Sequence, residues 1–235
     1  MSEYHTFVDF VLNTKLMEYA VAFLFIGLFA IFYKVLQAPP SAVTAKETVA
    51  GKAFDLIRGL LVPDGLGYHQ GHTWARLESA GTATVGMDDF AAKLVGDVER
   101  VKLPAVGTTL SQGEKAWTLM VDGKPVDMIS PVDGTVVAIN EEQSQGAQGL
   151  GEDPYGRGWL LKVESPKVNR SFKNLLSGLL ARQWTEQSVE KLFARANPEL
   201  GLVAGDGGLP FNGMARQLDE EHWDQIAREF FLSEG

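Results

Sequence analysis

The chain of 235 residues has no cysteine and only four histidines. The missing cysteines exclude disulfides, thiolate metal ligands, iron–sulfur clusters and a cysteine nucleophile. His69 and His72 are three residues apart, but no acidic residue or third ligand stands near them, so we expect no metal site. The sequence therefore predicts a protein whose own side chains supply no redox or metal centre.

An excess of basic residues is lacking as well. The chain has 21 lysines and arginines against 30 aspartates and glutamates, which gives a formal net charge of −9. Because a nucleic-acid-binding domain needs a basic surface, we exclude nucleic acid as a partner. Hydrophobic residues make up 45% of the chain, which is enough to form the core of one or two domains.

Charged residues are absent from residues 19–33 (YAVAFLFIGLFAIFY). With the flanking apolar residues this stretch reaches about 21 residues, long enough to cross a bilayer as a helix. We therefore expect a transmembrane helix over residues 16–37; the alternative is a buried core helix. Lysines and arginines are more frequent after this stretch than before it. The positive-inside rule then predicts a single-pass protein of the cell inner membrane whose C-terminal domain is cytoplasmic.

Two shorter segments flank the predicted span. Residues 1–15 have apolar side chains at helical spacing, which is compatible with a short amphipathic segment or with an irregular tail. Residues 38–63 begin with Pro39-Pro40, which end the preceding helix. Apolar residues then recur at intervals of three and four, which predicts an amphipathic helix over about 45–61 in this linker.

Residues 64–164 change to short β-rich runs separated by turn residues, a pattern typical of a β-sandwich or barrel. The predicted strands are Thr73–Leu77, Thr82–Val85, Val98–Leu103, Thr118–Val121, Val126–Ile129, Gly134–Ile139 and Gly158–Val163. Asp88–Leu94 predicts one or two helical turns capped by an aspartate. We therefore interpret Asp88 and Asp89 as a helix cap and its neighbour, not as paired catalytic carboxylates.

Residues 165–235 predict a helical C-terminal extension. Leucines from Leu175 onward, followed by apolar residues from Trp184 to Phe193, predict two helices around Thr185. Residues 201–213 are rich in glycine and predict a loop. A last helix is predicted from Asp219, with Trp223 and Phe230 on its apolar face. Because a free tail rarely carries such aromatic side chains, we expect this helix to pack on its own domain or on a partner.

Six motifs between residues 67 and 163 occur in the same order as in one known family. His72-Thr73-Trp74 matches an HEW opening, 83–91 matches ATVGIT-x-[YF]-A, 94–98 matches LGD[IV], 103–108 matches LP-x-VG, 130–134 matches SPVSG and 152–160 matches DPYG-x-GWL. The segment resembles the H protein of the glycine cleavage system. The resemblance implies an H-protein-like, lipoyl-type β-sandwich or barrel. The expected fold class is thus α+β: a transmembrane helix, this domain and a helical extension.

The family's chemistry depends on one lysine in the motif ESVKAASD, which lies at the tip of a β-hairpin and carries lipoate. An ungapped alignment from Ser130 puts Gly123 at that position and Met120 at the glutamate, while Asp127 still matches the aspartate. Lys124 comes one residue later. Asp122-Gly123 is typical of a two-residue hairpin turn, which would make Lys124 a strand residue. A slip of the hairpin by one residue would instead bring Lys124 near the tip.

Two functional hypotheses follow. In the first, the chain is a membrane-anchored, non-catalytic scaffold or accessory subunit of a membrane-associated complex, such as a respiratory or other energy-converting one. It then carries no cofactor, and its partners are the bilayer and the other subunits. In the alternative, it is a lipoyl carrier protein of a glycine-cleavage-like system, with lipoate covalently attached to Lys124. No nucleophile–base pair or metal cluster is evident, so we do not expect an enzyme.

Overall fold

The computed structural model describes Lys15, Tyr19 and residues 21–29, 56–79, 81–195 and 210–233. The chain divides into two compact units, Met1–Gly51 and Lys52–Gly235. Each unit is described by itself. Residues 1–14, the rest of 16–37 and residues 38–55 lie outside the described residues, so the amphipathic segment expected over 1–15 is not covered beyond Lys15.

In the first unit, residues 21–29 are helical and their side chains are exposed. No helix among the described residues is long and apolar enough to cross a membrane. The expected transmembrane helix over 16–37 is therefore wrong for the residues described. The single-pass inner-membrane placement with a cytoplasmic domain loses its basis with it.

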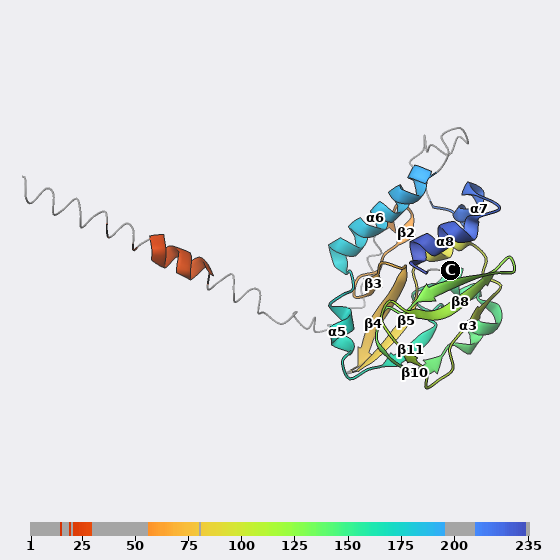
Figure 1. Cartoon of the computed structure of the whole chain (residues 1–235), viewed down its shortest axis with the longest axis horizontal. Helices are drawn as coiled ribbons and strands as arrows, with labels where there is room; N and C mark the ends of the chain where they lie inside the picture. Colours follow the sequence, from red (N-terminus) through yellow and green to blue (C-terminus); the bar gives the residue numbers. More distant parts are fainter. Residues whose placement is uncertain are drawn as a thin grey trace, which may run out of the picture. The chain divides into compact units, whose positions relative to one another are not determined.

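The second unit contains two main antiparallel sheets (Figure 1). The six-stranded sheet has the order β3 (Gly67–His69), β4 (Thr73–Ser79), β5 (Thr82–Met87), β11 (Leu161–Glu164), β10 (Gly134–Ile139) and β7 (Thr109–Leu110). The three-stranded sheet has the order β6 (Arg100–Lys102), β8 (Lys115–Val121) and β9 (Lys124–Ile129). Both sheets contribute to one hydrophobic core, for example through Val85 and Val163 from the first and Val126 from the second. This arrangement confirms the predicted H-protein-like β-sandwich.

The segment 56–61 is a β-hairpin and not part of a helix. β1 (Leu56–Ile57) pairs with β2 (Leu60–Leu61), and Leu56 lies opposite Leu61. Arg58 and Gly59 between them have φ values of +48° and +80°, which a right-handed helix excludes. The helix expected over about 45–61 is therefore wrong for its described part. The apolar spacing misled the prediction because Leu60 is buried in the sandwich core as a strand residue.

The first helix of the second unit, α2 (Asp89–Val95), confirms the predicted capped turn. Asp88 is the N-cap, and its carboxylate oxygen Oδ1 accepts a hydrogen bond from the amide of Ala91 at 2.8 Å. Gly96 ends the helix with φ +79°. A Cβ at this glycine would lie 2.9 Å from the Cα of Gly213, so the C-terminal extension passes directly over the end of α2.

The remaining helices differ from the sequence prediction in their number and limits. They are α3 (Glu141–Gly146), α4 (Gln148–Glu152), α5 (Val168–Phe172), α6 (Gly178–Arg195), α7 (Met214–Leu218) and α8 (Trp223–Phe231). The two helices expected around Thr185 are one: α6 runs through this position, and the Thr185 hydroxyl donates to the Ala181 carbonyl at 2.9 Å inside the helix. The loop expected over 201–213 lies outside the described residues as far as 209.

The last helix begins at Trp223 and not at Asp219. The carboxylate of Asp219 accepts hydrogen bonds from the amides of Glu221 and His222, at 3.1 and 2.8 Å, and so holds a turn before the helix. Trp223, Phe230 and Phe231 are buried, and α8 lies against β9, α2 and α7. The predicted docking helix therefore covers its own sandwich, as Figure 1 shows for the dark blue end of the chain.

We expect Phe231→Ala to lower the free energy of unfolding by about 3–5 kcal/mol, since it removes a fully buried aromatic ring. Chemical denaturation followed by tryptophan fluorescence measures this change. Leu232→Ala is the matched control, because Leu232 is 51% exposed and its truncation should cost less than about 0.5 kcal/mol. Equal, small effects of the two substitutions would show that α8 is a dispensable tail.

Candidate functional site

The hairpin between β8 and β9 is the candidate site because its turn lies where the resemblance places the lipoyl lysine. Val121 pairs with Lys124, so Asp122 and Gly123 are the two residues of the turn. Their φ values of +49° and +71° are those of a type I′ turn, which matches the twist of the flanking strands. Lys124 is thus the first residue of β9, and the hairpin has not slipped.

The alternation of side chains along β9 decides where Lys124 points. Val126 and Met128 face the core and are completely buried, while Pro125 and Asp127 face outward. Because residues two apart in a strand share a face, Lys124 lies on the same side as Val126. This is the side on which α8 packs. Lys124 therefore extends toward α8 and not away from the tip of the hairpin.

Three groups of the C-terminal extension contact the Lys124 ammonium. Its Nζ lies 2.8 Å from Oδ1 of Asp224, donates to the Glu221 carbonyl at 2.6 Å, and lies 5.7 Å from the ring centroid of Trp223. The Asp224 side chain is only 15% exposed, and that of Lys124 is 40% exposed. The hydrogen bond from Lys124 holds the pKa of Asp224 below its usual value, and the carboxylate is therefore ionised at neutral pH.

Two arginines of the extension hold the hairpin on either side of this lysine. Arg216 forms an ion pair with Asp122 at 2.8 Å, and its guanidinium lies 5.7 Å from the ring of Trp223. Arg228 donates to the Pro125 carbonyl at 3.2 Å and pairs with Asp224 at 3.4 Å. We call the four residues Arg216, Trp223, Asp224 and Arg228 the C-terminal clamp. The two arginines thus hold the chain on both sides of Lys124: Arg216 contacts the turn before it, and Arg228 contacts the strand after it.

Asp127, which matches the family's aspartate, lies on the outward face of the hairpin. Its carboxylate accepts a hydrogen bond from the Thr118 hydroxyl at 2.6 Å and pairs with Lys115 at 2.7 Å. Burial raises the pKa of Asp127, but the hydrogen bonds from Lys115 and Thr118 outweigh burial and hold it below the usual value. Asp127 and Lys124 thus lie on opposite faces of β9 and do not form a common site.

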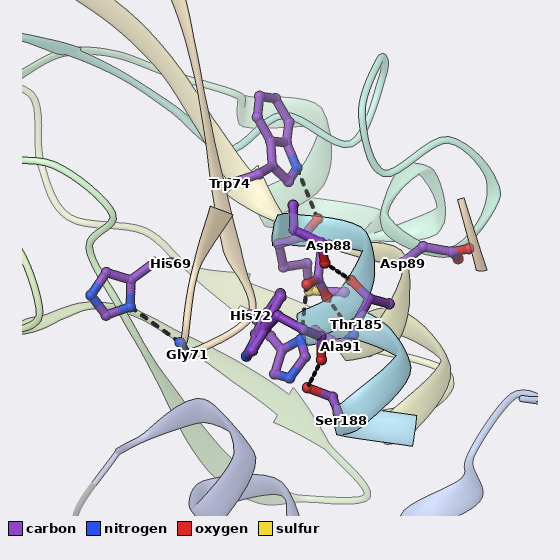
Figure 2. Close-up of polar contacts among 12 residues, drawn as sticks. His69, Gly71, His72, Trp74, Asp88, Asp89, Ala91, Thr185 and Ser188 are labelled. Atoms are coloured by element: carbon purple, nitrogen blue, oxygen red, sulfur yellow. Dashed lines mark hydrogen bonds and ion pairs between the residues drawn. The ribbon is translucent and has the colours of Figure 1, made fainter. Parts of the chain in front are cut away.

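The histidines predicted not to bind metal are separated by the turn between β3 and β4. Figure 2 shows His69 directed away from His72, with its Nδ1 accepting from the Gly71 amide at 3.1 Å. Burial lowers the pKa of His69. Among the residues that the structure describes, no group of three histidine, cysteine, aspartate or glutamate side chains is placed to hold a metal ion.

His72 packs and hydrogen-bonds inside the domain. Its Nδ1 lies 2.8 Å from Oδ2 of Asp88, and both side chains are buried (Figure 2). The ring is stacked between Phe90 and Trp184, with centroid distances of 4.1 and 4.4 Å. The other oxygen of Asp88 caps α2. These contacts assign His72 and Asp88 a structural role, because neither side chain is open to a substrate.

Comparisons with known proteins agree with the motifs. The family model described as glycine cleavage H-protein matches residues 66–190. The chain belongs to the glycine cleavage H-protein family. The glycine cleavage system H protein of Marinobacter nauticus is 41% identical over 103 residues, which are 44% of this chain and 79% of that protein. That of Pseudoalteromonas atlantica is 33% identical over 130 residues, 55% of this chain and 97% of the relative.

A solved structure is also similar. The crystal structure of a glycine cleavage system H protein from Mycobacterium marinum has 29% sequence identity and a TM-score of 0.48. The likeness covers 54% of this chain and 98% of that protein.

The C-terminal clamp lies outside the part of the chain that matches the H-protein family. The matched residues end at 190, whereas α7 and α8 begin at Met214 and Trp223. The clamp is therefore an addition to the H-protein domain that contacts the hairpin of that domain. Sequence reasoning did not find Arg216, Asp224 or Arg228. Their only signal was the charged first turn next to Trp223, and nothing in the linear sequence connects position 224 with position 124.

Because the folded-state pKa of Asp224 is lowered, its stabilising contribution is present above the unfolded value of about 3.9 and is lost as the pH falls through the folded value. We expect Asp224→Asn to lower stability at neutral pH by about 1 kcal/mol. The variant should also lose less stability than the unmodified chain between about pH 5 and pH 3. Urea denaturation across this range measures both effects.

Glu220→Gln is the control, because Glu220 is an exposed acid of the same extension and forms no ion pair with any residue that the structure describes. It should leave stability at neutral pH and the acid slope unchanged. If stability falls equally steeply with falling pH in Asp224→Asn and in Glu220→Gln, the pair with Lys124 does not stabilise the fold.

Proposed function

We propose that this chain is a non-catalytic interaction module: an H-protein domain without a lipoyl group, acting as a scaffold or accessory subunit of a protein complex. The observation that carries the proposal is the engagement of Lys124 by Asp224, the Glu221 carbonyl and Trp223. It is the lysine nearest to the family's lipoyl position, and its ammonium is already used within the chain.

The residues around Lys124 do not fit a lipoyl attachment. A lipoyl amide on Nζ would remove the positive charge and leave the carboxylate of Asp224, which is largely buried, without its lysine partner. The attached arm would also have to leave past α8, which packs on the same face of β9. Attachment therefore requires the helix to be displaced, at the cost of its buried aromatic contacts.

The turn itself supports the same proposal. The residue at the family's lipoyl position is Gly123, and a Cβ added there would meet no atom within 4 Å. The position is thus open to solvent, as a carrier lysine needs, but it has no side chain to modify. The accessible position is therefore Gly123, whereas the lysine nearest to it is Lys124.

A role through surface contacts also fits the chemistry of the described residues. The buried His72–Asp88 pair is enclosed by aromatic rings, and Asp122 and Lys124 of the hairpin form ion pairs with the extension. Neither arrangement presents a nucleophile and a base to a common substrate. We therefore place the activity of this chain in binding and not in catalysis.

The second candidate function is a lipoyl carrier of a glycine-cleavage-like system, lipoylated on Lys124. Membership of the H-protein family favours it, since the domain is of the lipoyl-carrier type. Lys124 is next to the turn, and its side chain keeps 40% of its surface exposed. In this candidate, α8 would have to release the lysine before a ligase reaches it.

We expect the full chain, coexpressed with a lipoate ligase and supplied with lipoate, to show no lipoyl adduct by intact mass. The H protein of Marinobacter nauticus, treated identically, shows that the ligase is active. A lipoyl mass on this chain that disappears in Lys124→Ala would overturn the first proposal in favour of the carrier function.

Two variants test why Lys124 is not lipoylated: because of its position after the turn, or because the C-terminal clamp covers it. Gly123→Lys puts a lysine in the turn, where left-handed backbone costs about 1–2 kcal/mol but the space is open. We expect this variant to gain a lipoyl group. Asp224→Ala removes the ion pair of Lys124 but leaves the lysine in β9, and we expect no adduct. An adduct on Asp224→Ala alone would show that the clamp, and not the register of the hairpin, prevents modification.

A further inference from the structure

The lysines and arginines of this domain are almost all used in ion pairs. In residues 56–79, 81–195 and 210–233, all but five of them lie within 4.0 Å of a carboxylate oxygen. The five without a partner form two groups, Arg100 with Lys102 on β6, and Lys167, Arg170 and Lys173 at α5. Free cations that gather in a chain with a net charge of −9 require an explanation.

The group at α5 is presented by a rigidly held helix. Val168 and Ser171 face inward and are buried, while Lys167, Arg170 and Lys173 are exposed. The Ser171 hydroxyl donates to the carboxylate of Asp133 at 3.1 Å. The side-chain amide of Gln112 donates to the Ser171 carbonyl at 2.9 Å. The cations thus project from a backbone that is already ordered, so little backbone entropy would be lost on binding.

Two exposed leucines follow this group in the chain. Leu179 and Leu180, at the start of α6, are 66% and 63% exposed. Figure 1 shows α5 next to the beginning of α6. Lys167, Arg170, Lys173, Leu179 and Leu180 are here called the basic–apolar patch. Exposed apolar side chains on an element next to one that carries unpaired cations are a composition typical of interaction surfaces.

We infer that the basic–apolar patch binds an acidic amphipathic segment of a partner protein, in which apolar residues meet the leucines and carboxylates meet the three cations. This inference rests on the proposed function as an interaction module and names the surface that it uses. Electrostatic complementarity of this kind directs encounter and fixes orientation. Since the three cations have no ion-pair partner among the described residues, no such pair has to be broken on binding.

The overall charge favours a short acidic segment over two other occupants. An anionic bilayer or a second copy of the chain presents an extended surface, which the remaining acidic surface of this protein would repel. A segment confined to the patch approaches fewer of those acids than an extended surface does, and charges beyond the screening length of about 8 Å act on it only weakly. The attraction of the three cations is then opposed much less.

The β6 group does not have the same character. Arg100 and Lys102 flank the buried Val101, and α3 lies alongside β6 with Glu141 and Glu142 in its first turn. These exposed acids lower the positive potential near β6. Charged side chains on a strand at the edge of a sheet also prevent edge-to-edge aggregation, which accounts for them without a partner.

The two groups supply a matched test on the full chain. Arg170→Glu with Lys173→Glu, and Arg100→Glu with Lys102→Glu, each replace one arginine and one lysine and change the net charge by the same four units. The probe is a fluorescein-labelled synthetic helix of about 15 residues, with glutamates on one face and leucines on the other. Fluorescence anisotropy at low and physiological salt measures its affinity, and a peptide of the same composition in scrambled order is the control.

We expect the α5 double variant to weaken binding about tenfold and to reduce its salt dependence, and the β6 double variant to change it less than about twofold. Leu179→Ala with Leu180→Ala should weaken binding by a similar factor but keep the salt dependence. All these positions are exposed, and circular dichroism confirms that the variants are folded.

Three results would overturn the inference: no binding of the ordered peptide, equal losses in the two charge variants, or cosedimentation with phosphatidylglycerol vesicles that the α5 double variant abolishes. The last result would assign the patch to a lipid surface. Failure here is distinguishable from failure of the proposed function, because a lipoyl adduct is detected by mass whether or not the peptide binds.

Discussion

The packing of α8 against the inward face of β9 determines what the hairpin of this domain can do. Val126 and Met128 of β9 and Phe231 of α8 belong to one hydrophobic core, so the helix and the strand cannot separate without exposing it. Lys124 is on the same face of β9 and therefore meets Asp224. Lys124, which would be mobile at the tip of a free hairpin, is thus held in an ion pair with α8.

His72 extends this constraint to the rest of the molecule. Its ring is stacked between Phe90 of α2 and Trp184 of α6, and it also lies near Phe230 and Phe231, with centroid distances of 6.2 and 6.5 Å. Asp88 holds the ring in place and caps α2 at the same time. The part that matches the H-protein family and the added extension consequently share one core. The proposed scaffold role rests on this arrangement, since a fixed hairpin leaves the surface of the domain as its means of contact.

Sequence reasoning succeeded where the structure depends on local chemistry. The strand Gly134–Ile139, the cap at Asp88 and the turn at Asp122-Gly123 were predicted correctly, because each depends on neighbouring residues. It failed where spacing admits two structures: the leucines of 56–61 fit a helical stripe and also a β-hairpin, and the φ values of Arg58 and Gly59 decide for the hairpin. The membrane helix failed differently: the apolar run predicts a span from composition alone, and no helix among the described residues is long and apolar enough to cross a membrane.

The sequence by itself determined the family, the β-sandwich and the displacement of Lys124 from the lipoyl position to the residue after the turn. These follow from ordered motifs and from the backbone preference of an Asp-Gly pair, which act over a few residues. Only the tertiary structure decided what Lys124 contacts. Asp224 is 100 residues away in the chain, and the side of β9 from which it approaches is set by the burial of Trp223 and Phe231. Contacts over such separations arise from the packing of whole elements, which no local pattern records.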